Sequence, residues 1–232
     1  YSKIIAVKTA TFLTQSRCVS LKNELKMNKT LKRVLKYLIE IIIVAFGVFL
    51  GVYYSNISAD NKKQKEKNRS IDLIIGELEF NKQLLEEQIE YHEKIKVEMD
   101  SIIPSLSEKE MYANFTRTVL KNMEIKNWKG FHFARLQKTA YESTKTSGIV
   151  KEFDIELVQK LSDIYDFQNG YMDFGTLILN KAIGINSSMK MMDFISTIEL
   201  MTSDLLGTEN YLLIKLEKSI TELKTPHNNG YN

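Results

Sequence analysis

The chain has 232 residues, of which 44% are apolar and 26% are charged, and these proportions are typical of a folded protein and not of a disordered one. Two prolines, ten glycines and a single cysteine, Cys18, exclude a collagen-like chain, an internal disulfide framework and a zinc site built from cysteines. The net charge of +3 is unevenly distributed, because residues 71–232 carry 18 basic and 25 acidic side chains. An acidic body repels phosphate backbones, so we expect no nucleic-acid partner.

Residues 1–33 form a basic N-terminal segment. The chain begins with Tyr1, and Met27 opens a short basic stretch directly before an apolar run. We therefore interpret Met27 as the true start of the protein. On this interpretation residues 1–26, which include Cys18, do not belong to the mature chain.

The apolar run that follows extends over 21 residues, from Val34 to Tyr54, and its last 14 residues carry no charge. An α-helix of that length spans about 31 Å, which matches the hydrocarbon core of a bilayer at about 30 Å. We predict a transmembrane helix over residues 34–55, with the lipid bilayer as a partner of the chain. Two alternatives remain open from the sequence: a cleaved signal peptide and a buried core helix.

Basic residues flank this run on both sides: four lie before it or in its first turn (Lys29, Lys32, Arg33 and Lys36), and five lie within a polar linker at residues 56–69. Cytoplasmic flanks are enriched in lysine and arginine, and the leading cations lie closer to the run than the trailing ones. We expect a single-pass protein of a bacterial inner membrane with the C-terminal domain outside the cytoplasm; the opposite orientation is the alternative. The linker contains no proline or glycine, so the helix can continue through it.

Gly47 and Gly51 lie four residues apart within the apolar run. Such a pair lets two membrane helices approach closely, and it predicts a dimer contact. The alternative is that the spacing arises by chance, because glycine is common in membrane helices.

Residues 70–225 show helical periodicity throughout and predict an all-α domain, an antiparallel helical bundle with two long helices. The first long helix carries two rows with a seven-residue, coiled-coil-like repeat from Ile71 to Ile102; Ser70 is the expected cap, and Pro104 ends the helix.

Shorter helices follow in the sequence. A capping box, Ser107 to Glu110, opens one helix, and a second is expected over residues 132–147 with Gly148 as its C-terminal cap.

Asp154 is the expected cap of the second long helix, of about 30 residues, on which Gly175 and Ala182 would admit a close partner helix. A break at Asn169-Gly170 is the alternative. Two further helices are expected near residues 187–206 and 208–224, the latter capped by Thr208.

Polar residues interrupt the inner rows of both long helices. They are Asn81, Gln88 and His92 on the first helix and Gln168 on the second. Buried polar groups need hydrogen-bond partners, so we expect a polar layer. Two hypotheses follow: a layer that fixes the register of the helices, or a small-ligand pocket of a sensor-like bundle.

The sequence offers no catalytic, cofactor-binding or metal-binding motif. None of the three histidines has a glutamate three residues before it, which removes the di-iron bundle signature, and no nucleophile-elbow or phosphate-loop motif occurs. We expect a non-enzymatic protein without a cofactor that acts through a protein partner or self-association, as a scaffold or accessory subunit. The alternatives are a ligand-binding sensor-like bundle and a membrane-tethered enzyme with an unrecognised site.

Two segments carry a resemblance to a known family. Glu40-Ile41 followed by Gly47 and Gly51, and then Ala140-Tyr141 with Ser147-Gly148, resemble the motifs of an uncharacterised family of bacterial single-pass membrane proteins with an N-terminal Glu-Ile/Val-rich anchor, known as a domain of unknown function. The resemblance covers residues 27–185. Ile39 departs from it, since a glycine is usual there, and the usual Asn-Trp pair after the anchor is missing. The resemblance implies membrane anchoring and helical content, and no activity.

Overall fold

A computed structural model describes residues 29–116, 118, 121 and 123–225. Within these limits the chain divides into two compact units between Asn61 and Lys62. The expected start at Met27 and Cys18 lie outside the described residues.

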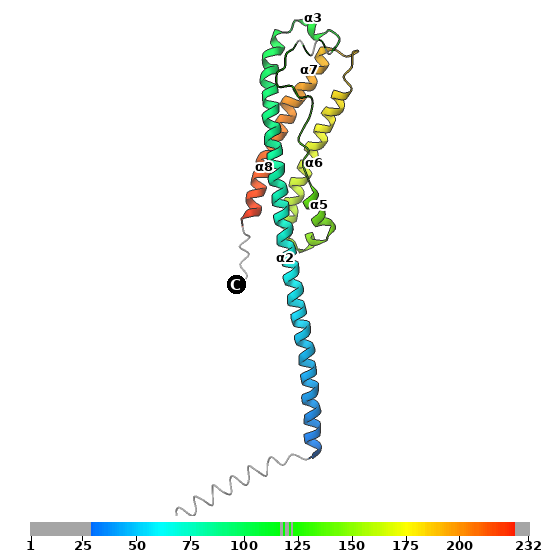
Figure 1. The fold of residues 1–232 in the computed structure, drawn as a ribbon, viewed down its shortest axis with the longest axis vertical. Coiled ribbons are helices and arrows are strands. Elements are labelled where there is room, and N and C mark those ends of the chain that lie inside the picture. The colour runs from blue at the N-terminus through cyan, green and yellow to red at the C-terminus, as the bar shows by residue number, and fades with distance from the viewer. Residues whose placement is uncertain (1–28, 117, 119–120, 122, 226–232) are drawn as a thin grey trace, which may run out of the picture. The chain divides into compact units, whose positions relative to one another are not determined.

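The described chain is all-helical, as predicted (Figure 1). The α-helices are α2 (Lys29–Ile102), α3 (Glu108–Met111), α5 (Thr139–Thr146), α6 (Ile155–Ile183), α7 (Met191–Glu199) and α8 (Leu206–Lys224). The described chain also contains two 3-10 turns, η1 (Ile103–Ser105) and η2 (Ile149–Glu152), and a π-helical segment, η3 (Leu200–Leu205). Among the described residues the only β-type pairing is an isolated bridge between Asn114 and Lys190.

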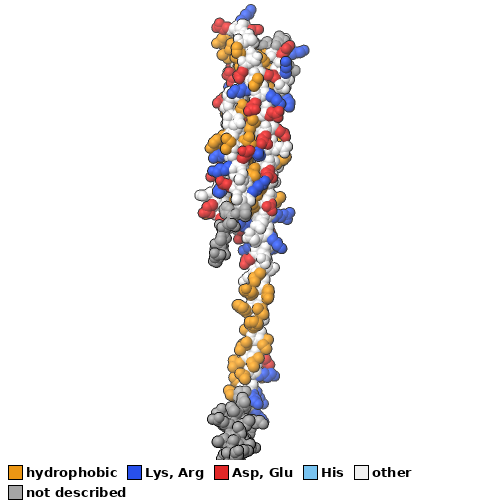
Figure 2. Space-filling model, turned by 90° about the vertical axis from the view of Figure 1, so that its left-hand side faces the viewer, with side chains coloured by type: hydrophobic (Ala, Val, Ile, Leu, Met, Phe, Trp, Pro, Cys, Tyr) orange, Lys and Arg blue, Asp and Glu red, His pale blue; other side chains and the backbone are white. Residues whose placement is uncertain are grey.

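The described part of the first unit is the N-terminal portion of α2, which contains the apolar run. Within the described residues, α2 is the one helix long and apolar enough to cross a membrane, and none of the side chains in its most apolar window is buried. Figure 2 shows these apolar side chains gathered on the outside of the helix. Lys36 Nζ lies 3.8 Å from Glu40 Oε1. Within the described residues, the apolar run is therefore not a buried core helix.

The second unit, residues 62–225, is built around one hydrophobic core. The two rows of α2 predicted from the sequence face this core, where Leu78, Leu85 and Ile95 are fully buried. α6, α7, η3 and α8 supply the other walls of the core. At about 25 cal/mol for each Å² of buried apolar surface, this core is the main source of stability for the unit.

The contacts between helices show their directions. Glu77 and Asn81 of α2 contact Tyr165 and Gln168 of α6, so the two long helices run in the same direction. In α8, Lys224 contacts Glu79 whereas Glu209 contacts His92, so α8 runs opposite to α2. We predicted an antiparallel bundle with two long helices; its two long helices, α2 and α6, are parallel to each other, and α8 is antiparallel to α2.

The chain returns from the end of α2 to the start of α6 through a non-helical segment, residues 129–138, which we call the return segment. The predicted helix over residues 132–147 is wrong for its first seven residues, because α5 begins only at Thr139. Phe133, Ala134 and Leu136 of the return segment are buried in the core. A buried segment that is not helical cannot supply hydrogen-bond partners for its own backbone N–H and C=O groups. Side chains of the neighbouring helices must therefore supply them.

Several predicted helix ends are confirmed and others are not. The capping box of Ser107 and Glu110 is present, although α3 ends after one turn at Met111. Gly148 has φ +78° after α5, as a C-terminal glycine should. Ser70 lies inside α2, which also runs through the linker as predicted, so Ser70 caps nothing.

The last third of the chain also differs from prediction at its caps. α6 runs without a break through Asn169-Gly170, as predicted, but the side chain of Asp154 makes no capping bond at its start. α7, η3 and α8 follow one another without a loop. Thr208 therefore lies within a helix, where its hydroxyl donates to the carbonyl of Asp204 at 2.9 Å.

Candidate functional site

The four polar residues predicted on the inner rows are all buried, with exposed fractions between 0% and 7%. Asn81 holds the return segment most directly. Its Nδ2 donates to the carbonyl of Gln137, and its Oδ1 accepts from the backbone N–H of Gln137, both at 2.7 Å. Nδ2 also donates its second proton in a hydrogen bond to Gln168 Oε1 at 2.7 Å. The amide of Asn81 thus takes the place of a neighbouring strand for this part of the return segment.

Gln88 and His92 hold the return segment about two and three turns further along α2. Gln88 Nε2 donates to the carbonyl of His132 at 3.2 Å, and His132 Nδ1 lies 2.9 Å from Gln88 Oε1, which accepts its proton. Gln88 Nε2 also lies 2.8 Å from His92 Nε2. Burial lowers the pKa of His132, and the neighbouring His92 and Lys129 lower it further. A neutral His132 is the form that fits this network.

His92 is joined to the other side of the core by Glu209. His92 Nδ1 lies 2.8 Å from Glu209 Oε2, and both side chains are fully buried. The other carboxylate oxygen accepts from the hydroxyl of Tyr171 at 2.9 Å, and that hydroxyl accepts from the backbone N–H of Ala134. Burial raises the pKa of Tyr171, and the Glu209 carboxylate raises it further, so the phenol stays a donor. One network therefore links α2, the return segment, α6 and α8.

Glu77 performs a related task at the end of the return segment. Its carboxylate accepts from the backbone N–H of Ala140 at 2.7 Å and from that of Tyr141 at 3.4 Å. These are groups of the first turn of α5, whose own N-cap residue, Lys138, offers no side-chain bond. Tyr165 donates to the same carboxylate at 2.6 Å. Glu77 thus caps α5 from a different helix and complements its dipole.

Gly175 of α6 makes room for the return segment and not for a helix. A Cβ at this position would lie 2.4 Å from Cγ of Phe133. The close approach predicted at Gly175 is confirmed, but its partner is an aromatic ring of the return segment. Phe133 in turn packs edge-to-face on Tyr171, with ring centroids 6.1 Å apart.

The polar seam, by which we mean Glu77, Asn81, Gln88, His92, Gln168, Tyr171 and Glu209, therefore serves the chain's own backbone. Gln168 Nε2 is the one atom among the described buried side chains without a hydrogen-bond partner. The seam joins the helices to one another through the return segment, which is the structural role of a register-fixing layer.

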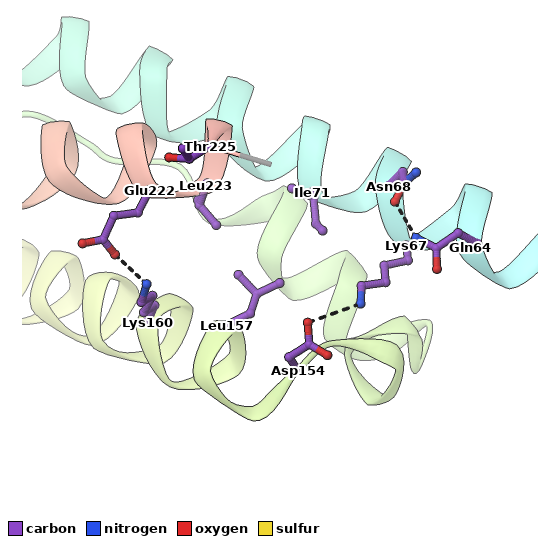
Figure 3. Close-up of a pocket in the computed structure, with 10 residues that line it drawn as sticks. All are labelled: Gln64, Lys67, Asn68, Ile71, Asp154, Leu157, Lys160, Glu222, Leu223 and Thr225. Carbon is purple, nitrogen blue, oxygen red and sulfur yellow. Dashed lines mark hydrogen bonds and ion pairs between the residues drawn. The ribbon is translucent and has the colours of Figure 1, made fainter. Parts of the chain in front are cut away.

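A separate pocket, which we call the Lys67 pocket, lies between α2, the start of α6 and the end of α8, with a volume of about 320 Å³. Ten residues line it: Gln64, Lys67, Asn68, Ile71, Asp154, Leu157, Lys160, Glu222, Leu223 and Thr225 (Figure 3). Two ion pairs flank an apolar floor: Lys67 Nζ lies 3.7 Å from Asp154 Oδ2, and Lys160 Nζ lies 2.8 Å from Glu222 Oε2. Hydrogen bonding to Lys160 lowers the pKa of Glu222, which therefore stays ionised.

Gly47 and Gly51, the predicted dimer contact, have no atom within 4 Å of a Cβ added at either position. Both positions are thus open to a second helix. The described residues contain no group of three or more histidine, cysteine or acidic side chains that could hold a metal ion.

The sequence reasoning missed Glu77, Glu209 and Tyr171, and it missed the Lys67 pocket. A signal for Glu209 existed, because it lies seven residues before Leu216, on the row that faces the core. No comparable signal existed for the pocket, whose lining comes from three distant segments.

Comparison of the chain with protein-family models, curated proteins and solved structures finds no match. The resemblance to a family of single-pass membrane proteins stays a prediction from its motifs.

Proposed function

We propose that this chain is a single-pass membrane protein whose helical bundle, residues 62–225, acts through contacts with other proteins as a scaffold or accessory subunit. The observation that carries the proposal is the apolar window of α2, in which no side chain is buried. Side chains such as Ile41, Ile42 and Val44 are each 64% to 66% exposed, whereas comparable side chains in residues 62–225 fill a core. Exposed apolar surface of this extent is unfavourable in water and favourable in a bilayer.

The polar seam supports a structural role more than a catalytic one. His92, Glu209 and Glu77 are the buried groups whose chemistry could serve catalysis, and each is engaged with its own chain. Full burial of His92 and Glu209 also keeps these two groups out of contact with a substrate in solution.

An apolar hollow supports contact with a protein partner. Leu73 and Phe80 of α2 are 56% and 43% exposed, and they line a hollow of about 680 Å³ together with Ala140 of α5. A photo-crosslinking residue at Phe80 in native membranes should capture a second polypeptide, whereas the same residue at exposed Val97 should not. Equal capture at both positions would contradict a specific contact.

Gly47 and Gly51 support self-association of the anchor as part of this role. Replacing both by isoleucine should lower the dimer fraction in native membranes, and replacing Val48 and Val52 by isoleucine should leave it unchanged. A dimer fraction that is insensitive to the glycines would remove self-association from the proposal.

The proposed orientation places the bundle outside the cytoplasm of a bacterium. Reporter fusions test it, since a reporter active only outside the cytoplasm should respond at the C-terminus and not at the N-terminus. The mass of the mature chain also separates an anchor from a signal peptide, because a cleaved chain would lack residues 34–55.

A further inference from the structure

We propose that the Lys67 pocket binds a small zwitterion that carries a phosphate ester and an ammonium group, the chemistry of an aminophospholipid headgroup. The proposal rests on the proposed membrane location only for the source of this ligand. The pocket itself lies entirely within residues 62–225, and its chemistry stands independently of the anchor.

The first argument is the incomplete partnership of Lys67. Its side chain is only 19% exposed, yet Asp154 Oδ2 at 3.7 Å is beyond hydrogen-bond distance. Within the described part of the chain, this ion pair is the one interaction of its ammonium group. The ammonium group at the end of this mostly covered side chain has three protons to donate, so a ligand oxygen would supply what the protein does not.

The second argument is the balance of charge around the pocket. The lining contains two lysines and two carboxylates, and Figure 3 shows the two ion pairs on opposite sides of the pocket. A simple anion would be attracted by Lys67 and Lys160 but repelled by Asp154 and Glu222, so the lining offers it no net attraction. A ligand with both signs of charge pairs its acidic group with a lysine and its ammonium group with a carboxylate.

The third argument is the surface between the two ion pairs. Ile71, Leu157 and Leu223 form an apolar floor there, and Gln64 and Asn68 add amides at one edge (Figure 3). A short carbon linker between the two charged groups of a ligand fits such a floor. The volume of about 320 Å³ lies at the lower end of the range for small-molecule sites, as a headgroup requires.

The membrane is the natural source of this chemistry for an anchored chain, because the lipid is present in large excess. The pocket residues Gln64, Lys67 and Asn68 belong to the basic linker that follows the apolar run in the sequence. Basic residues close to a membrane segment attract phosphate groups. A free phosphoethanolamine ester presents the same two charged groups in water.

Calorimetric titration of the full chain in zwitterion-free detergent micelles tests the proposal. Glycerophosphoethanolamine is the soluble probe, and phosphatidylethanolamine and phosphatidylglycerol nanodiscs are the lipid probes. We expect saturable binding of glycerophosphoethanolamine, and stronger binding to phosphatidylethanolamine than to the anionic phosphatidylglycerol discs. Absence of binding to both ethanolamine probes, or equal binding to both lipids, would overturn the proposal. Binding to the soluble probe alone would assign the free ester as the source.

Three variants locate the site. Lys67→Gln should weaken binding at least about tenfold, which corresponds to about 1.4 kcal/mol. Glu222→Gln should weaken binding of glycerophosphoethanolamine but not of methyl phosphate, which lacks the ammonium group. Lys94→Gln removes a surface cation of α2 outside the pocket and is the control. If Lys67→Gln retains its helix content by circular dichroism and binds like Lys94→Gln, the pocket is not the site.

A failure of this inference is distinct from a failure of the proposed function. If the chain is anchored but binds none of the three probes, the proposed function stands and the proposed ligand site is wrong. If the chain binds glycerophosphoethanolamine but stays soluble without detergent, the proposed ligand site stands and the proposed membrane anchor is wrong.

Discussion

His92 Nδ1 and Glu209 Oε2 lie 2.8 Å apart, although the two residues are 117 positions apart in the sequence and neither side chain is exposed to solvent. The carboxylate accepts, so Nδ1 carries the proton. This contact connects α2 to α8, and through Tyr171 it reaches α6 and the backbone of the return segment. A single buried carboxylate thus fixes the relation of four chain segments.

Removal of this carboxylate should be costly. Glu209→Ala leaves the donors of His92 and Tyr171 buried without an acceptor, and we expect a loss of about 3–5 kcal/mol in the free energy of unfolding. Glu93→Ala, at an exposed position of α2, should change it by less than about 0.5 kcal/mol. Thermal unfolding of the full chain in micelles, followed by circular dichroism, gives both values. Equal stability of the two variants would show that the network does not hold the helices together.

Asn81 and Gln168 should differ in importance although they are hydrogen-bonded to each other. Asn81→Ala leaves the backbone N–H and carbonyl of Gln137 without hydrogen-bond partners, which should lower the free energy of unfolding by about 2–4 kcal/mol. Gln168→Met removes one acceptor but also removes the unpartnered Nε2, so its cost should be smaller, below about 1.5 kcal/mol. The same unfolding measurement ranks them, and the reverse order would contradict the assignment of Asn81 as the main support of the return segment.

The two interior glycines of α6 provide a matched pair. Gly175→Ala places a Cβ against the ring of Phe133, and we expect a loss of about 1–3 kcal/mol. Gly170→Ala meets no atom within 4 Å, and it should stabilise the helix by up to about 1 kcal/mol. Changes in melting temperature of opposite sign are therefore expected. A gain in stability at Gly175 would mean that Phe133 does not pack there.

His132 should make the stability depend on pH. Because burial lowers the pKa of His132 in the folded chain, the unfolded chain, with a pKa of about 6.5, binds its proton at a higher pH. The contribution of His132 is therefore complete above about pH 6.5 and is lost as the pH falls below it. The melting temperature should fall between pH 7.5 and pH 5, and His132→Gln should flatten that part of the curve. An unchanged slope in the variant would assign the pH dependence to other groups.

The parts of this fold that the sequence predicts are those that repeat locally. The rows from Ile71 to Ile102 face the core as predicted, because a seven-residue repeat of apolar side chains on a helix has only one buried face. Continuity of α6 through Asn169-Gly170 followed from the same reasoning.

The parts that the sequence does not predict depend on distant contacts. Residues 132–138 contain good helix formers, and the polar seam, together with the space at Gly175, makes their non-helical conformation favourable. The four polar residues predicted to be buried are buried. Their partners could not be predicted, because backbone N–H and C=O groups occur in every residue and leave no pattern in the sequence. The Lys67 pocket combines three segments separated by more than sixty positions, and no local pattern reports such a combination.

Extraction of native membranes with alkaline carbonate tests the central claim, the anchor, most directly. Ile42→Asp together with Val44→Asp adds two charges to the exposed window and, at about 2.5–3.5 kcal/mol per charge, should prevent insertion. Ile42→Leu together with Val44→Leu is the control. We predict that the natural chain and the leucine control stay in the membrane pellet and that the aspartate variant moves to the supernatant. Release of the natural chain by carbonate, without detergent, would contradict the account.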